Sequence, residues 1–189
     1  YQKSIFSESK NNISLRTEAL AFDDVLLVPQ YSEIESRANV NLNQNLDSNI
    51  KLKIPIISSP MDTVTEAAMA RSMHELGGLG IIHRYNSISE QTAMVRDVVM
   101  EGVHHPAAAI GVTGDFKERA MELVRSGVNI LCLDVAHGHH ILMERALKTL
   151  KDSYGKSIHL MAGNVATLEG FNDLADWGAD SVRCGIGGG

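Results

Sequence analysis

The fold is decided by residues 129–163, "NILCLDVAHGHHILMERALKTLKDSYGKSIHLMAG", in which two short apolar runs flank one amphipathic segment. The runs at 129–134 and 158–163 are nearly continuous in apolar residues, as strands are when both faces of their sheet are covered. Between them, apolar side chains recur at helical spacing on one face, while Glu144 and Lys148 stand four positions apart on the other. The stretch therefore predicts a strand–helix–strand unit whose two strands run parallel.

The same unit repeats along the chain at intervals of about 25 residues. The apolar runs are residues 55–59, 79–83, 107–112, 129–134, 158–163 and 180–185. Glycines mark the expected helix ends, where a positive φ is favoured, at Gly78, Gly102, Gly127, Gly155 and Gly178. This repetition predicts an α/β protein with a parallel sheet. The fold class that it favours is a (β/α)8 TIM barrel, of which the chain covers about six strands; a doubly wound sheet is the alternative.

The composition and charge of the chain restrict the kinds of protein and of binding partner that are compatible with it. Of the 189 residues, 44% are hydrophobic, which is enough for one domain with a sizeable core. The formal net charge of −6 argues against nucleic acid or an anionic membrane as partner, although backbone amides can still hold a phosphate group locally. No apolar run approaches the ~18 residues of a membrane span, and the polar start has no signal-peptide pattern. Cys132 and Cys184 lie in apolar runs and make no disulfide framework, which favours a cytoplasmic setting.

Polar residues gather where the apolar runs end, which is where parallel α/β folds bind ligands. Asp134 ends one run and is either a helix cap or an acceptor for a ligand hydroxyl. Asn164 either meets a heterocycle or ribose edge or stabilises its own turn. Ser59 places a hydroxyl at a strand end, and Asp62 is a candidate cap for the helix that includes Glu66.

Histidines are frequent in these turns. Three of them crowd the turn after residue 134: His137, His139 and His140. A metal site there is one interpretation, but no second carboxylate or cysteine cluster accompanies them, so a loop that lines a pocket is favoured. His104 and His105 lie away from the strand ends and are expected on the surface, while His83 could serve either role.

Six stretches, read in order, resemble one known family. They are "FDDVLLVPQYS", "IPIISSPMDTVTEA", "GGLGIIHR", "LDVAHGH", "AGNVAT" and "RCGIGGG". Together they are similar to the IMP dehydrogenase/GMP reductase family from about Leu20 to Gly189. The resemblance implies a (β/α)8 barrel, usually assembled as a homotetramer, that acts on a purine nucleoside monophosphate with a nicotinamide cofactor.

The resemblance also implies roles for individual residues. The substrate-binding matches are Ser59, Met61, Asn164 and Arg183. The cofactor-binding matches are Asp134, which corresponds to the carboxylate that meets the nicotinamide riboside, and Gly185. Gly187 and Gly189 match loop glycines whose carbonyls hold a potassium ion, and Gly188 replaces the more common Pro or Ser.

The family's nucleophile is a cysteine that the resemblance places just after Gly189, so no catalytic residue is expected in the chain itself. Neither Cys132 nor Cys184 matches that position. We therefore expect residues 1–189 to be a single catalytic-barrel domain, incomplete at its C-terminus. The stretch from Met94 to Val112 leaves no room for the CBS pair that most dehydrogenases insert there.

The resemblance favours the dehydrogenase, which converts IMP to XMP with NAD, because reductases usually carry Asn where this chain has Pro60. GMP reductase, which converts GMP to IMP with NADPH, is the alternative; the missing CBS pair, "IESRANVNL" and "IIHRY" support it. A non-catalytic nucleotide-binding module is a further alternative. The presence or absence of a cysteine after Gly189 distinguishes it from both enzymes.

Overall fold

A computed structural model describes residues 22–185 of the chain, which fall into two units. Residues 22–33 belong to the first unit and form the short 3-10 helix η1 (Phe22–Asp24) followed by irregular chain. The second unit begins at Ile34 and holds all the elements discussed below. No helix in the described residues has the length and apolar character that a membrane span requires.

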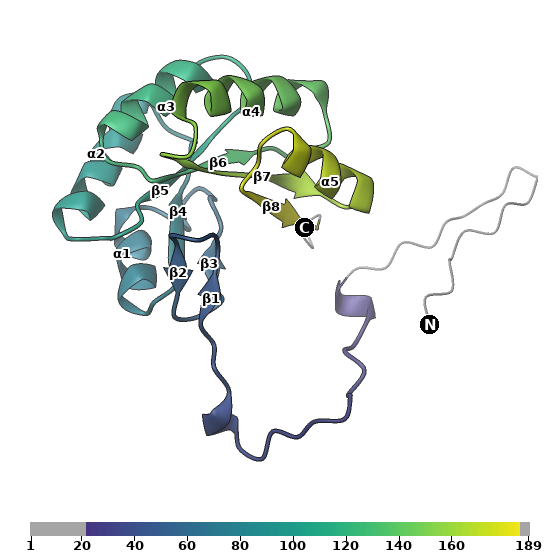
Figure 1. The fold of residues 1–189 in the computed structure, drawn as a ribbon. Coiled ribbons are helices and arrows are strands. Elements are labelled where there is room, and N and C mark those ends of the chain that lie inside the picture. Colours follow the sequence, from purple (N-terminus) through teal and green to yellow (C-terminus); the bar gives the residue numbers. More distant parts are fainter. Residues whose placement is uncertain (1–21, 186–189) are drawn as a thin grey trace, which may run out of the picture. The chain divides into compact units, whose positions relative to one another are not determined.

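A six-stranded parallel sheet forms the centre of the second unit (Figure 1). Its strands are β3 (Ile57–Ser58), β4 (Leu79–Ile82), β5 (Ala107–Ile110), β6 (Ile130–Asp134), β7 (His159–Val165) and β8 (Ser181–Cys184). Each strand pairs with its neighbour in sequence, so the order across the sheet is β3-β4-β5-β6-β7-β8. The sheet curls, as expected of six strands of a (β/α)8 barrel (Figure 1). All six predicted runs contain a strand, and the doubly wound alternative is wrong, because its strand order would reverse within the sheet.

Helices connect successive strands on the outer side of the curled sheet (Figure 1). They are α1 (Ala67–Glu75), α2 (Ile88–Met100), α3 (Phe116–Arg125), α4 (Ile141–Tyr154) and α5 (Leu168–Asp176). Most of the predicted helix ends are confirmed, because Gly102, Gly127, Gly155 and Gly178 all have positive φ. At the first helix the prediction is wrong by one position. There Gly77 has the positive φ of 87°, whereas Gly78 is needed because a Cβ would lie 2.7 Å from the Ile56 carbonyl oxygen.

The central strands β4 to β7 are buried on both faces, and their inward-facing and outward-facing apolar residues enter different clusters. In β5, Ala108 and Ile110 pack with the helices, while Ala107 and Ala109 face the inside of the curl. The inner cluster consists of Ile50, Leu52, Leu79, Ile81, Ala107, Ala109, Ile130, Cys132 and Met161. This double burial explains why the strands read as continuous apolar runs.

A small antiparallel hairpin supplies part of the inner cluster. Its strands are β1 (Gln44–Asn45) and β2 (Lys51–Leu52). Ile50 and Leu52 are buried against the inward-facing residues of the sheet. The hairpin therefore covers the inner face, and it contributes one polar anchor, Asp47, in the turn between its two strands.

Asp47, His159 and Ser181 form a chain of hydrogen bonds at the amino ends of β7 and β8. The Asp47 Oδ2 atom lies 2.5 Å from His159 Nδ1, and His159 Nε2 lies 2.8 Å from Ser181 Oγ. Asp47 also accepts hydrogen bonds from the backbone N–H groups of Asn49 and Ile50. Burial acts to raise the pKa of Asp47, but these hydrogen bonds outweigh it and hold that pKa below its ordinary value. The three side chains thus fasten the hairpin to the sheet.

Replacing His159 with alanine should lower the free energy of unfolding by about 2 kcal/mol, because the Asp47 carboxylate loses a charge-assisted partner in a half-buried position. Ser181→Ala removes a single neutral hydrogen bond and should cost about 1 kcal/mol. Urea denaturation of both variants beside the exposed-site control His104→Ala measures the difference. Equal stability of His159→Ala and His104→Ala would contradict the anchoring role.

Candidate functional site

An ion pair joins the carboxyl ends of β6 and β8. The Arg183 Nη1 atom donates to Asp134 Oδ1 at 2.5 Å, and both side chains are largely buried. β7 lies between them, and its Gly163 is the register partner of both Asp134 and Arg183. A Cβ on Gly163 would lie 2.6 Å from the Arg183 Cβ. Arg183 therefore reaches Asp134 across a strand position where only glycine leaves room.

One of the two alternatives for Asp134 is excluded by the residue that caps α4. The N-cap of α4 is His140, whose Nδ1 accepts from the Leu142 N–H, so the interpretation of Asp134 as a helix cap is wrong. The chain has no basic residue close to Asp134 in sequence, and β8 supplies one from 49 positions away. Among the described residues, no hydrogen bond to the second carboxylate oxygen is found, which leaves Oδ2 able to accept from a ligand hydroxyl.

Cys132 lies on β6, two residues before Asp134, and its sulfur is 3.8 Å from Arg183 Nη1. Burial raises the pKa of the Cys132 thiol to about 12, although the nearby guanidinium opposes the shift. Burial likewise acts to lower the pKa of Arg183, but Cys132 and Asp134 raise it above its ordinary value. Arg183 is thus held as a cation, and Cys132 stays a thiol at neutral pH rather than a nucleophile.

Two predicted substrate residues come together on the inner face of the sheet. Ser59 and Arg183 line a cavity of about 170 Å³, whose walls include Ile81 and Met161. Met61 follows in the same loop as Ser59 and is exposed. A larger cavity of about 520 Å³ lies at the amino ends of the strands, where His104 and His105 are among its lining residues. None of the predicted site residues lines that larger cavity.

Asn164 ties the end of β7 to the loop that follows β8. Its Nδ2 group donates to the Gly185 carbonyl oxygen at 2.8 Å, and the Gly185 N–H donates to the Val165 carbonyl. Asn164 therefore holds Gly185, the residue after β8, and does not stabilise only its own turn. The potassium ligands predicted at Gly187 and Gly189 lie outside the described residues, as does the expected nucleophile.

Two of the three histidines after β6 make structural hydrogen bonds. His139 Nε2 lies 2.7 Å from Asp173 Oδ2 on α5, and His140 caps α4. Within residues 22–185, these histidines do not gather with other His, Cys, Asp or Glu side chains into a group of three or more that could hold a metal ion. His139 and His140 therefore have structural partners, and the interpretation of this turn as a pocket-lining loop stays a prediction.

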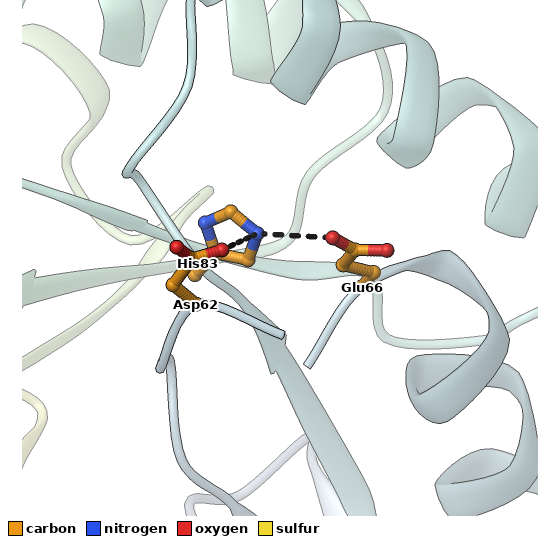
Figure 2. Close-up of side chains that lie close together, drawn as sticks. All are labelled: Asp62, Glu66 and His83. Carbon is orange, nitrogen blue, oxygen red and sulfur yellow. Dashed lines mark ion pairs between the residues drawn. The ribbon is translucent and has the colours of Figure 1, made fainter. Parts of the chain in front are cut away.

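A cluster that sequence reasoning missed lies at the carboxyl ends of β3 and β4 (Figure 2). His83 Nε2 points toward two carboxylates, at 3.8 Å from Asp62 Oδ1 and 3.6 Å from Glu66 Oε1. Asp62 does not cap α1, because the N-cap position is occupied by Glu66, which makes no capping hydrogen bond. The order of the predicted strands could have indicated this cluster, because consecutive parallel strands bring the residues at their carboxyl ends to one edge of the sheet. We call these three residues, Asp62, Glu66 and His83, the His83 cluster.

A family model described as the IMP dehydrogenase / GMP reductase domain matches residues 19–189. The chain belongs to this family. An inosine-5'-monophosphate dehydrogenase of Cryptosporidium parvum is 36% identical over 90% of the chain and 52% of its own length. The corresponding enzyme of Borreliella burgdorferi is 33% identical over 90% of the chain and 54% of its own length. A GMP reductase of Leishmania major is 27% identical over 90% of the chain and 62% of its own length.

The chain thus spans from 52% to 62% of the length of these three relatives. Membership of the IMP dehydrogenase/GMP reductase family confirms the resemblance read from the six sequence stretches. The curled parallel sheet agrees with this family membership. The binding roles predicted for Ser59, Met61, Asn164 and Asp134 stay predictions, which the arrangement at the carboxyl edge makes specific enough to test.

Because the Asp134–Arg183 pair is largely buried, it should contribute more to the free energy of unfolding than an exposed ion pair does. Arg183→Met leaves a largely buried carboxylate without its partner and should lower the free energy of unfolding by about 2 kcal/mol. Arg71→Met is the matched control, because Arg71 meets Glu101 at the same 2.5 Å but both side chains are about two fifths exposed. Its loss should cost under about 1 kcal/mol. Urea titrations that rank the two variants in the opposite order would refute this reading.

Proposed function

We propose that the full-length protein is an oxidoreductase that acts on a purine nucleoside monophosphate with a nicotinamide dinucleotide. The observation that carries the proposal is the Asp134–Arg183 pair at the carboxyl edge of the sheet, beside the cavity lined by Ser59. Asp134 Oδ2 can accept a hydrogen bond from the nicotinamide ribose, and Arg183 holds that carboxylate in position through its hydrogen bond to Oδ1. Ser59 and Met61 would then contact the purine nucleotide, with Asn164 beside them.

The proposed direction is IMP to XMP with NAD. Pro60 favours it, since reductases of the family usually carry Asn there, and relatives named as dehydrogenases reach 36% and 33% identity against 27% for the GMP reductase. A cysteine thiolate after Gly189 would add to C2 of IMP, and a hydride would leave C2 for the nicotinamide ring. Water would then hydrolyse the thioimidate and release XMP. The barrel's own contribution is positioning and electrostatics.

One observation favours GMP reductase, which would convert GMP to IMP with NADPH. α2 and β5 are joined by only residues 101–106, at the place where most dehydrogenases of the family insert a CBS pair. The family resemblance also underlies three further parts of the proposal. These are a homotetramer, a cytoplasmic location and a potassium ion held by the carbonyls of Gly187 and Gly189.

Turnover assays with the full-length protein should show NADH formation from IMP and NAD, and little or no oxidation of NADPH with GMP. The reason is the dehydrogenase-like loop that contains Pro60. Absorbance at the reduced-nicotinamide band follows both reactions. Activity confined to GMP and NADPH would mean that the short connection between α2 and β5 was the better indicator.

Alkylation with iodoacetamide should abolish this activity, and saturating IMP should protect it, because the proposed nucleophile is an accessible thiolate. Cys132 will not confuse the result, because it is buried and its pKa is about 12. Cys184 is exposed, so Cys184→Ser serves as the control and should remain sensitive. Full activity after replacement of the cysteine that follows Gly189 would exclude the covalent mechanism. The non-catalytic nucleotide-binding module remains the alternative if no such cysteine follows Gly189 and no turnover is found with either substrate pair.

A further inference from the structure

The cavity of about 520 Å³ at the amino ends of the strands has no role in the function proposed above. It lies between the hairpin strand β2, the second half of α1, the amino ends of β4 and β5, and the connection from α2 to β5. The Asp134–Arg183 pair and the His83 cluster lie at the opposite edge of the sheet. A cavity of this volume is in the range that holds small organic molecules, and the side chains around it define the chemistry of such a ligand.

Basic side chains from three parts of the chain gather around this cavity. They are Lys51 and Lys53 at β2, His74 on α1, and His104 and His105 in the connection from α2 to β5. We call these five residues the amino-edge cluster. The rings of His74 and His104 are in edge-to-face contact, with their centroids 4.9 Å apart. Lysines and protonated imidazoles donate hydrogen bonds and carry positive charge, so the cluster favours an anion.

Two carboxylates among the described residues that line the cavity reduce this positive charge. Glu101 forms an ion pair with Arg71, whose Nη1 atom lies 2.5 Å from Glu101 Oε1. Glu75 lies near His74 and acts to raise the pKa of that ring. Because Arg71 neutralises Glu101, the lysines of the cluster outweigh the remaining acid, and protonation of the imidazoles increases the excess of positive charge.

The histidines of the cluster are biased toward the neutral form when no anion is bound. Burial lowers the pKa of His74, and the nearby His104 and Lys53 lower it further. Burial also lowers the pKa of His105, and the other two rings of the cluster add to the shift, while Asp47 opposes it. A bound dianion stabilises the protonated form of these rings. Its binding therefore takes up protons and strengthens as the pH falls toward the ordinary pKa of histidine.

The remaining walls of the cavity are formed by apolar side chains and glycines. The apolar members are Leu52, Ala70, Leu79, Val98, Val103, Pro106 and Ala107. An apolar wall beside a group of cations fits an organic molecule that carries a phosphate group better than it fits a free inorganic anion. A phosphate monoester has about two negative charges at neutral pH and several strong acceptor oxygens, which match the donors of the cluster.

We propose that the amino-edge cluster binds the phosphate group of a small organic phosphate, whose apolar part packs against Leu52, Leu79 and Val98. Lys51, Lys53 and His104 are exposed, so the ligand enters from solvent. The site is separate from the proposed nucleotide and cofactor sites, because it lies at the other edge of the sheet. The inference therefore does not rest on the proposed function.

Calorimetric titration of the full-length protein with phenyl phosphate tests the inference without turnover. At about pH 6, Lys53→Met and His74→Gln should each weaken phenyl phosphate about tenfold. Lys156→Met is the matched control and should leave the affinity unchanged. Lys156 is exposed just before β7, at the same edge of the sheet, but does not line the cavity. Benzoate, which has the same ring and a single charge, should bind about tenfold more weakly than phenyl phosphate.

Two further titrations identify the charge state of the site and the source of the phosphate. Sulfate stays a dianion between about pH 8 and about pH 6, so any increase in its affinity as the pH falls comes from protonation of the protein. This increase should be present in the unmodified protein and smaller in His74→Gln. Inorganic phosphate should bind more weakly than phenyl phosphate, since it makes no contact with the apolar walls.

Four results would overturn the inference. The first is failure of the unmodified protein to bind phenyl phosphate, and the second is equal affinity in Lys53→Met, His74→Gln and Lys156→Met. The third is an affinity for sulfate that stays constant or decreases as the pH falls. The fourth is equal affinity for inorganic phosphate and phenyl phosphate, which would make free phosphate the ligand. The turnover of IMP with NAD tests the proposed function separately.

Discussion

The ladder of hydrogen bonds between each strand and its neighbour in sequence is the constraint on which the rest of the structure depends. Because every pairing in the six-stranded sheet from β3 to β8 is parallel, each connection has to return along the sheet, and the five helices that do so within the described residues lie on its outer side. The same constraint brings all six carboxyl ends to one edge. Asp134, Gly163 and Arg183 are neighbours there because three successive strands are in register, although 49 positions separate the two charged residues.

The strands and helices could be predicted from the sequence because the forces that select them are local. A strand buried on both faces has to be apolar along its length, and a covering helix needs an apolar stripe, so both are visible within a window of about fifteen residues. Helix ends at glycine are also local. The error at Gly78 shows the limit, because two adjacent glycines serve different needs: Gly77 has the left-handed conformation and Gly78 the close backbone contact.

The side-chain partnerships could be predicted only in part, because they depend on which strands are adjacent and on how far each side chain reaches. Asp134 was recognised as a candidate acceptor, but its partner Arg183 was assigned separately, since nothing near either residue in sequence connects them. For the three histidines after β6 the sequence favoured a pocket-lining loop over a metal site, but it did not show that α5 supplies Asp173 as the partner of His139. Conversely, His83 was recognised as a candidate, but no feature beside it in the sequence pointed to its two carboxylates, which come from the loop after the preceding strand.

Gly163 carries a consequence for how this edge of the sheet can evolve. Its missing side chain is the space through which Arg183 passes, so any larger residue there meets the arginine Cβ at 2.6 Å and its carbonyl oxygen at 2.8 Å. Both atoms are fixed to the backbone of β8, and neither can rotate away. A lineage that replaces this glycine has to move a whole strand, whereas one that replaces Arg183 by a shorter residue still keeps the sheet. The sheet can therefore accommodate substitutions at Arg183, which change the charge of the site. It cannot accommodate a larger residue at Gly163, because no space is left for a side chain.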